Sequence, residues 1–310
     1  MPLASLGASA ALAAALALHG LRKRSLSRSG ALAAMLVGFL HMAAGLRFGC
    51  TLILFYLSSS KLTRWRDDLK SRLDAAHSTG GQRGAAQVCA NSLLGAALAV
   101  ACAWQAGAVS SINGSGGSSS GAPNASAVQA ASATLAAAFV AFYAVCCADT
   151  WSSEIGIASK TPPRLITTRS VVPPGTNGGV TPLGTAAAAA GGLFVGCCYW
   201  SLAAVAAMWA GANGSASSAA LADWRLVPLA LVAGLAGSLL DSLLGATLQW
   251  SGQDERSGKA VSGRPPPGSA AARHVRHVSG RDVLSNTGVN VVASVMSSGL
   301  AAAAWSAWAA

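Results

Sequence analysis

Long apolar segments recur along the whole chain and are separated by shorter polar or basic connections. They cover approximately residues 3–20, 30–58, 88–108, 128–148, 183–210, 226–250 and 285–309. A helix needs about 20 apolar residues to cross the hydrocarbon core of a bilayer, and most of these segments reach that length. Because backbone polar groups inside lipid must hydrogen-bond within the protein, the sequence predicts an all-α, polytopic helical membrane bundle.

The composition also indicates a membrane protein. Of the 310 residues, 53% are hydrophobic and 10% are charged, whereas soluble proteins carry about 25% charged residues. The formal net charge of +11 does not indicate a nucleic-acid partner, because the basic residues gather between the apolar segments. The seven cysteines lie in or beside apolar segments, so we expect neither a structural disulfide nor a zinc site.

The basic residues also predict which connections face the cytosol. All 21 lysines and arginines except Arg47 and Arg225 lie in four segments, 21–29, 59–87, 149–182 and 251–284. The polar loops 109–127 and 211–224 contain no lysine or arginine, and they hold the three Asn-x-Ser sequons of the chain. The positive-inside rule therefore predicts that the basic segments are cytosolic and that the two loops are lumenal.

Segment 30–58 has basic residues on both sides, so a single crossing would place one basic flank on the wrong side of the membrane. His41, Gly45 and Arg47 interrupt this segment near its middle. We therefore expect two short helices, near 13 residues each, that form a re-entrant or tightly turned hairpin. Together with the other segments, this predicts about six spans plus the hairpin, with both termini lumenal.

The chain is interpreted as one helical transmembrane domain over residues 1–310. Residues 1–20 form the first span, 21–87 the hairpin and a basic cytosolic loop, and 88–310 the core spans with the polar motifs. Loops 109–127 and 251–272 are rich in Ser, Gly or Pro, and we expect them to be flexible rather than folded domains. The endoplasmic reticulum is the first expected location, and a plastid envelope is the alternative in a photosynthetic organism.

Asp241 lies deep inside the apolar segment 226–250. A carboxylate at that depth is costly unless it is compensated, and it therefore indicates a functional site. Helical spacing places Asp241, Gly245 and Gln249 on one stripe, with Ser238 and Ser242 beside it. We expect this stripe to face the interior of the bundle.

A second polar stretch, 148–156, ends the segment 128–148. On a continuing helix Asp149 and Ser153 share a face. Glu154 lies about 100° around the helix from Ser153, so we expect both carboxylates to reach one cavity only if the helix breaks or rotates there. Taken singly, such carboxylates are also common at solvated helix ends.

A glycine-rich stretch, 173–181, comes directly before the helix expected from residue 183. Adjacent glycines expose backbone N–H groups, and the helix N-terminus behind them favours an anion such as phosphate. The stretch lacks the Lys-Ser/Thr of a Walker A loop, and Asn-Gly-Gly is also common in ordinary turns. The residues expected to bind phosphate are Gly175, Thr176, Asn177, Gly178, Gly179 and Thr181.

The last span begins beside a fourth polar stretch, which contains Arg273, Asn286 and Asn290. Acidic side chains that hold a divalent cation, a phosphate loop and a nearby arginine are the parts of a phosphoryl-transfer site. We expect Mg²⁺ at Asp149 and Asp241, with Glu154 as a further candidate. Arg273 or Arg164 would neutralise developing charge, and Ser153, Ser242, Gln249, Asn286 and Asn290 would support these groups.

This arrangement at the cytosolic ends of the spans suits a lipid or isoprenoid phosphate together with a nucleotide, with the head group in the cytosol and the tail between helices. The same residues would also suit a carrier for a small ion or anion, which likewise uses intramembrane carboxylates. A membrane protein without chemistry is a third interpretation, and Asp241 in lipid disfavours it.

These four stretches, together with Leu57–Trp65, Gly80–Arg83 and Pro163–Thr168, resemble the transmembrane protein 19 family of multi-pass membrane proteins. The resemblance extends from about Leu21 to Asn290, and several motifs occur in the family order. That family is related more distantly to the plant and cyanobacterial phytyl-phosphate kinases, which phosphorylate an isoprenoid monophosphate to the diphosphate.

The kinase branch has similar Asp-x-x-Ser-Ser-Glu-Ile-Gly and Pro-x-Gly-Thr motifs. In this chain Asp149, Ser153, Glu154 and Gly156 match the first motif, and Pro173, Gly175 and Thr176 match the second. The chain departs from that branch at Asn177-Gly-Gly and at Asp241. The resemblance therefore implies a lipid-phosphate kinase, and the departures concern its substrate more than its site.

Overall fold

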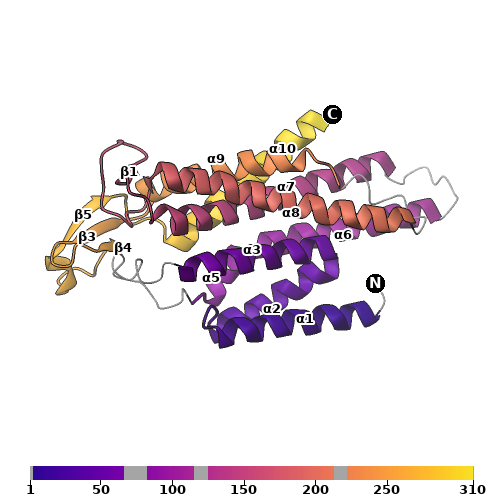
Figure 1. Ribbon diagram of the computed structural model, residues 1–310, viewed down its shortest axis with the longest axis horizontal. Helices are drawn as coiled ribbons and strands as arrows, with labels where there is room; N and C mark the ends of the chain where they lie inside the picture. The colour runs from indigo at the N-terminus through magenta and orange to yellow at the C-terminus, as the bar shows by residue number, and fades with distance from the viewer. Residues whose placement is uncertain (1–2, 66–81, 115–124, 213–221, 310) are drawn as a thin grey trace.

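The computed structural model describes residues 3–65, 82–114, 125–212 and 222–309. The molecule is elongated, and its helices run roughly along the long axis (Figure 1). The labelled strands lie at one end, whereas the chain termini lie toward the other (Figure 1). This mostly helical architecture agrees with the bundle expected from the apolar segments.

The N-terminal part of the chain forms three consecutive helices, α1 (Leu3–Arg22), α2 (Arg28–Ala44) and α3 (Leu46–Trp65). The chain reverses between α2 and α3 at Gly45, whose φ of 152° is accessible mainly to glycine. This reversal confirms the expected hairpin in segment 30–58. Its two helices are longer than the expected halves, since they have 17 and 20 residues and α3 continues into polar residues as far as Trp65.

The hairpin is attached to the rest of the bundle through His41. Its side chain is buried, and its Nε2 atom lies 2.7 Å from the Tyr143 hydroxyl. The Nδ1 atom lies 2.7 Å from the carbonyl oxygen of Val37, one turn earlier in the helix. A short helix α5 (Ala85–Ala90) and the apolar helix α6 (Leu93–Gly114) follow, and both contact α2.

Four long helices form the remainder of the bundle: α7 (Ala125–Gly156), α8 (Pro182–Ala212), α9 (Leu226–Leu248) and α10 (Asn286–Ala309). Each contains a stretch that is long and apolar enough to cross a membrane. Helix α7 lies at the centre and contacts the other three. Its residues 136–148 are buried without interruption, because they are apolar on every face.

Helices α8 and α9 approach one another closely through small residues. A Cβ atom on Gly192 would lie 2.5 Å from the Ala230 carbonyl oxygen, and one on Gly196 would lie 2.8 Å from the Ala230 Cβ. A Cβ atom on Gly234 would in turn lie 2.8 Å from the Gly192 Cα. Such contacts need glycine and are typical of helix pairs in lipid, where close backbone approach takes the place of hydrophobic burial.

Two short antiparallel β-structures cover the end of the bundle. Strands β1 (Arg164–Leu165) and β2 (Gly179–Val180) form a ribbon between α7 and α8. Strand β3 (Ser251–Asp254) pairs with both β4 (Ala260–Ser262) and β5 (Val275–Ser279).

Segment 251–272 was expected to be a flexible loop, but part of it is regular structure. The segment supplies two strands of this sheet and a short 3₁₀ helix, η2 (Ala271–Arg273). Its strands have only four and three residues, Ser-Gly-Gln-Asp and Ala-Val-Ser, which is too short to show a hydrophobic period. The turns between them use Gly258 and Gly263, both at positive φ.

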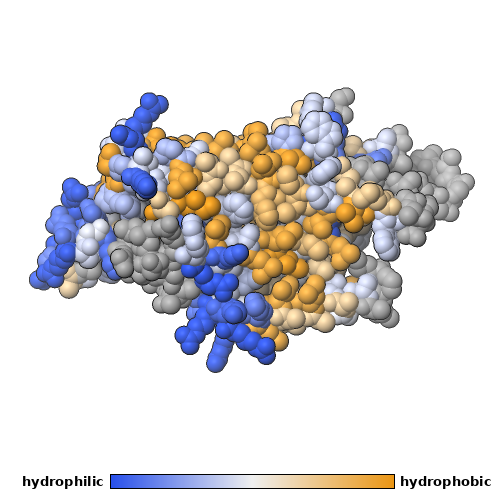
Figure 2. All heavy atoms as spheres, in the orientation of Figure 1, coloured by the Kyte–Doolittle hydropathy of each residue, from blue (hydrophilic) through white to orange (hydrophobic). Residues whose placement is uncertain are grey.

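The surface agrees with a membrane setting. Figure 2 shows hydrophobic residues gathered across the middle of the visible face, with hydrophilic residues over the strand-bearing end and near the α1–α2 connection. Many exposed side chains on the helices are large and apolar, including Leu36, Leu54, Trp104, Val232 and Leu300. All seven cysteines are free.

Candidate functional site

A polar cavity of about 820 Å³ opens at the strand-bearing end of the bundle. Its walls come from the ends of α7, α8, α9 and α10, the segment 156–181, and a distant segment around Arg83. This volume is typical of sites for small-molecule ligands. The predicted site residues that line it are Asp149, Ser153, Glu154, Gly175, Thr176, Asn177, Gly178, Gly179, Thr181, Asp241, Ser242, Gln249, Asn286 and Asn290.

The predicted arginines lie elsewhere. Arg273 is exposed on η2 and does not line the cavity. Arg164 is also exposed, and its Nη1 donates to the carbonyl oxygen of Arg169 at 2.9 Å. The basic side chains that do line the cavity are Arg83 and Lys160. Arg273 lies on η2, just before β5, and this short helix does not border the cavity, although Ser262 of the neighbouring strand β4 does.

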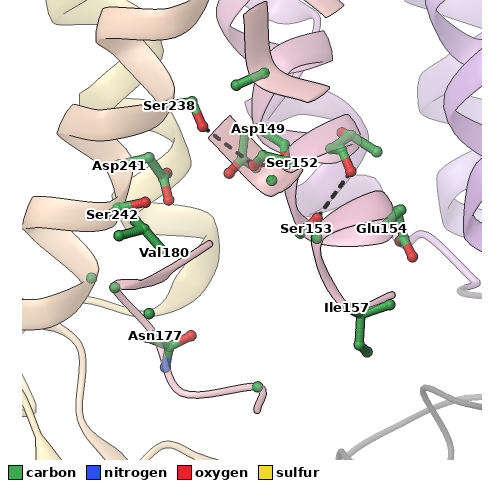
Figure 3. A pocket seen from close by; sticks show the side chains of 18 of the residues that line it. Asp149, Ser152, Ser153, Glu154, Ile157, Asn177, Val180, Ser238, Asp241 and Ser242 are labelled. Carbon is green, nitrogen blue, oxygen red and sulfur yellow. Dashed lines mark hydrogen bonds between the residues drawn. The ribbon is translucent and has the colours of Figure 1, made fainter. Parts of the chain in front are cut away.

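Asp149 on α7 and Asp241 on α9 both line the cavity, and their side chains point toward each other (Figure 3). Asn290 on α10 lies between them: its Nδ2 is 3.4 Å from Asp149 Oδ2. With the amide turned by 180°, its nitrogen donates instead to Asp241 Oδ2 at 3.2 Å and to the Asn286 carbonyl oxygen at 2.8 Å. The Asn290 amide on α10 can thus donate a hydrogen bond to either carboxylate, depending on its orientation.

Two serines connect α7 to α9 beside this carboxylate pair. The Ser238 hydroxyl donates to the Ser152 hydroxyl at 3.3 Å (Figure 3). Ser238 precedes Asp241 by three residues and Ser152 follows Asp149 by three, so each serine lies on the same helix face as its carboxylate. Within the described residues Asp241 forms no salt bridge, and its side chain is half-buried at the cavity.

Helix α7 neither breaks nor rotates between the two carboxylates, contrary to the sequence expectation. It continues unbroken to Gly156, and both Asp149 and Glu154 still line the cavity, because the cavity wraps around the end of the helix. Glu154 points away from Asp241 (Figure 3). Its Oε1 accepts a hydrogen bond from the Thr63 hydroxyl of α3 at 3.0 Å.

Glu154 therefore belongs to a second polar cluster, together with Arg83. Arg83 Nη1 donates to the Ser60 hydroxyl of α3 at 3.1 Å. Burial lowers the pKa of the Arg83 guanidinium, whereas nearby Tyr56 and Glu154 raise it. In the part of the chain that the structure describes, no three His, Cys, Asp or Glu side chains form one metal-ligating group, so Glu154 does not join Asp149 and Asp241.

The glycine-rich stretch is a tight loop rather than an open cradle of side-chain donors. The Thr176 hydroxyl donates to the Pro173 carbonyl oxygen at 2.7 Å, and Asn177 Nδ2 donates to the Ser251 hydroxyl at 2.7 Å. The Thr181 hydroxyl accepts a hydrogen bond from the Gly184 N–H at 3.0 Å and thereby caps α8. These side chains hold the loop in place, and its backbone forms the surface facing the cavity.

Gly178 fixes this loop against α9. Its φ is 77°, and an added Cβ atom would lie 2.4 Å from the Ala246 Cβ and 2.6 Å from the Ser242 carbonyl oxygen. Only glycine fits both the backbone conformation and the space. The loop is consequently held one helical turn from Asp241.

Two helix N-termini border the same cavity. Helix α8 begins at Pro182 behind its Thr181 cap, and α10 begins at Asn286. Thr181, Gly184, Asn286 and Thr287 all line the cavity. Thr181 and Ser285 already accept the N–H groups of Gly184 and Gly288, so it is mainly the helix dipoles that favour negative charge beside the carboxylate pair.

Comparison with known proteins assigns the chain to a family. The model of the family described as Integral membrane protein DUF92 matches residues 11–298. The chain belongs to this DUF92 family. It is 39% identical over 287 residues to Protein PGR of Arabidopsis thaliana, which covers 91% of this chain and 90% of that protein.

A second relative of this DUF92 chain comes from an archaeon. The chain is 34% identical over 114 residues to the uncharacterized membrane protein MJ0933 of Methanocaldococcus jannaschii, which covers 37% of this chain and 40% of that protein. No solved structure matches the chain significantly.

The DUF92 chain also places residues in the cavity that the sequence prediction had not assigned to the site. Thr63, Arg83 and Lys160 are the principal ones. A signal existed for Arg83, since it ends the Gly80–Arg83 stretch noted in the family resemblance. Thr63 likewise lies in the Leu57–Trp65 stretch of the resemblance, but only the packing of α3 against α7 brings it to the cavity.

Proposed function

We propose that this chain is a membrane-embedded phosphotransferase that moves a phosphoryl group from a nucleoside triphosphate to a lipid phosphate of isoprenoid type. The observation that supports this most directly is the pairing of Asp149 and Asp241 beside two helix N-termini in one polar cavity. Carboxylates favour a cation and helix N-termini favour phosphate. A phosphoryl-transfer site needs both.

The donor set fits a hard divalent cation such as Mg²⁺. Asp149 and Asp241 would hold it, and the Asn290 amide and the hydroxyls of Ser152 and Ser238 are nearby oxygen donors. Bound there, the cation would neutralise phosphate oxygens during transfer. Because Asp241 forms no salt bridge within the described residues, such a cation would also compensate its charge.

In the proposed reaction an oxygen of the lipid phosphate attacks the terminal phosphorus of the nucleotide. The bond from that phosphorus to its bridging oxygen breaks, and the bonding electrons leave with the nucleoside diphosphate. The chain would orient both phosphates through the N-termini of α8 and α10, and Arg83 and Lys160 would offset their negative charge. The products are a lipid diphosphate and a nucleoside diphosphate.

The family resemblance supports the same reaction class. The motifs around Asp149–Gly156 and Pro173–Thr176 resemble those of phytyl-phosphate kinases, and both lie at the cavity. A reaction on a membrane lipid also suits an integral membrane protein. The endoplasmic reticulum or a plastid envelope is the proposed location.

The test uses purified full-length protein in nanodiscs with magnesium, nucleotide labelled on its terminal phosphate, and phytyl, farnesyl and geranylgeranyl monophosphates. We expect label in a lipid diphosphate. Asp241→Asn should lower the rate roughly 100-fold or more, because it removes charge that is needed at the cation. Glu255→Gln is the matched control: it makes the same carboxylate-to-amide change on an exposed turn outside the cavity, and its rate should stay unchanged.

Folded protein that transfers no label with any nucleotide and lipid pair would reject the phosphotransferase. The carrier would then be favoured, because Asp241 lies within α9, a helix long enough to cross a membrane. Flux of an ion or anion into sealed vesicles, abolished by Asp241→Asn, would be its signature. Equal activity of Asp241→Asn and the unmodified protein in both assays would reject both functions for this carboxylate.

A further inference from the structure

A second, smaller cavity of about 90 Å³ lies among helices α1, α2, α3 and α5, beside the polar one. Its walls are mostly apolar and include Ala17, Val37, Ile53, Phe55 and Val88. The polar site described above does not use this cavity. Its composition suits hydrocarbon rather than water, since an apolar cavity offers no partners for water molecules.

The two cavities meet at Arg83, Gln87 and Asn91, which line both of them. The Arg83 backbone is held on both sides by the α1–α2 connection. Its N–H donates to the Ser25 carbonyl oxygen at 3.0 Å, and its own carbonyl oxygen accepts from the Ser27 N–H at 3.0 Å. A fixed cation therefore lies at the junction between a polar and an apolar space.

We propose that the apolar cavity receives the first carbons of the hydrocarbon chain of a phosphorylated lipid whose phosphate binds beside Arg83. An amphiphile needs an anion site and an apolar crevice in direct continuity, and the shared wall at Arg83 provides that continuity. The inference rests on the proposed function for the nature of the head group. It adds where the hydrocarbon chain of the lipid lies within the protein.

The volume of the apolar cavity limits how many carbons of the lipid's hydrocarbon chain it can hold. An apolar cavity of about 150 Å³ accommodates the six carbons of benzene, so 90 Å³ corresponds to about three or four carbons. The remainder would leave between α2 and α3, where Leu36 and Leu54 are exposed. Selectivity would therefore depend on branching near the phosphate and only weakly on total chain length.

Photolabelling tests this location without needing turnover. The probe is a prenyl monophosphate with a diazirine on the carbons next to the phosphate, irradiated with the full chain in nanodiscs and mapped by mass spectrometry. We expect label on Val37, Ile53 or Val88, and competition by unlabelled prenyl monophosphate but not by the prenyl alcohol. Label at Leu235 and Leu239, which line the far side of the polar cavity, would overturn the proposal.

A cavity-filling variant provides the second test. Ala34→Leu adds bulk to the apolar cavity, whereas Ala15→Leu makes the same change on an exposed position of α1. We expect Ala34→Leu to reduce specific labelling and to raise the KM for the lipid about tenfold with the nucleotide KM unchanged. If Ala34→Leu and Ala15→Leu gave the same labelling and the same KM for the lipid, the apolar cavity would not be the binding site of the hydrocarbon chain.

The two proposals fail separately. Specific labelling of Val37, Ile53 or Val88 in protein that transfers no phosphate would keep the lipid site and reject the phosphotransferase. Phosphate transfer with label at Leu235 and Leu239 would keep the phosphotransferase and reject this path for the chain. Arg83→Lys, which retains the cation, should label more strongly than Arg83→Gln, because the head group needs that charge.

Discussion

At the residue scale, Gly178 sets the distance between the glycine-rich loop and the carboxylate pair. It combines a positive φ with direct contact against α9, and both conditions exclude any larger residue. Gly258, in the turn between β3 and β4, also has a positive φ, of 70°, but a Cβ atom there would meet nothing within 4 Å. Substituting Gly258 therefore tests backbone strain alone, whereas substituting Gly178 tests backbone strain together with lack of space.

We predict that Gly178→Ala lowers the free energy of unfolding by about 2–5 kcal/mol, the sum of left-handed backbone strain and overpacking against Ala246. Gly258→Ala should cost only the backbone part, about 1–2 kcal/mol. Thermal unfolding in detergent, followed by tryptophan fluorescence, measures both. Equal losses in the two variants would mean that the loop moves away from α9 without cost.

The carboxylates of the site could be predicted from the residues themselves, whereas Arg83 was marked only by the family resemblance. Asp241 is conspicuous because it interrupts an apolar run, and Asp149 because it ends one. Arg83 reaches the cavity from a segment more than sixty residues away from Asp149 along the chain. Its place depends on how the α1–α2 connection holds it, which no local pattern records.

At the scale of elements, helices α8 and α9 are joined by glycine contacts that leave no room for side chains. Gly192 faces the backbone of Ala230 and Gly234. Gly299 in α10 has nothing within 4 Å of an added Cβ atom. Both are helical glycines in membrane-spanning stretches, so they differ mainly in their surroundings.

We predict opposite effects of the same substitution at these two sites. Gly192→Ala should destabilise the protein by about 1–3 kcal/mol, because it forces α8 and α9 apart. Gly299→Ala should stabilise it by about 0.5–1 kcal/mol through higher helix propensity. Unfolding by denaturing detergent resolves this difference. A stabilising effect at Gly192 would contradict the close helix contact.

The helices could be predicted from hydropathy, because each long apolar run must satisfy its own backbone in lipid. The turn at Gly45 was also predictable from its polar neighbours and the basic flanks. The sheet of β3, β4 and β5 was not. Its strands are short, and they are held by pairing across the 251–279 segment and by the contact of Ser251 with Asn177.

At the scale of the whole molecule, the strand-bearing end and the chain termini lie at opposite ends of the bundle (Figure 1). The basic connections predict that the strand-bearing end is cytosolic. Arg264 is exposed beside the sheet, and Ala307 is exposed in the last turn of α10. These two positions therefore report the two sides of the membrane.

We predict that Arg264→Cys reacts with a membrane-impermeant maleimide added from the cytosolic side of sealed vesicles, and that Ala307→Cys reacts only from the lumenal side. The unmodified protein, whose seven cysteines lie in or beside apolar segments, gives the background. Labelling of both variants from the same side would reject the predicted crossing of α10.

Helix α7 has 32 residues, which corresponds to about 48 Å of helix against a hydrocarbon core of about 30 Å. Its last turns, with Asp149 and Glu154, can therefore stand at the level of the lipid head groups while the rest of the helix stays in the bilayer. A lipid substrate would diffuse laterally to such a site without being extracted. Turnover would then follow surface-dilution kinetics, in which the mole fraction of the lipid in the membrane, rather than its bulk concentration, sets the rate.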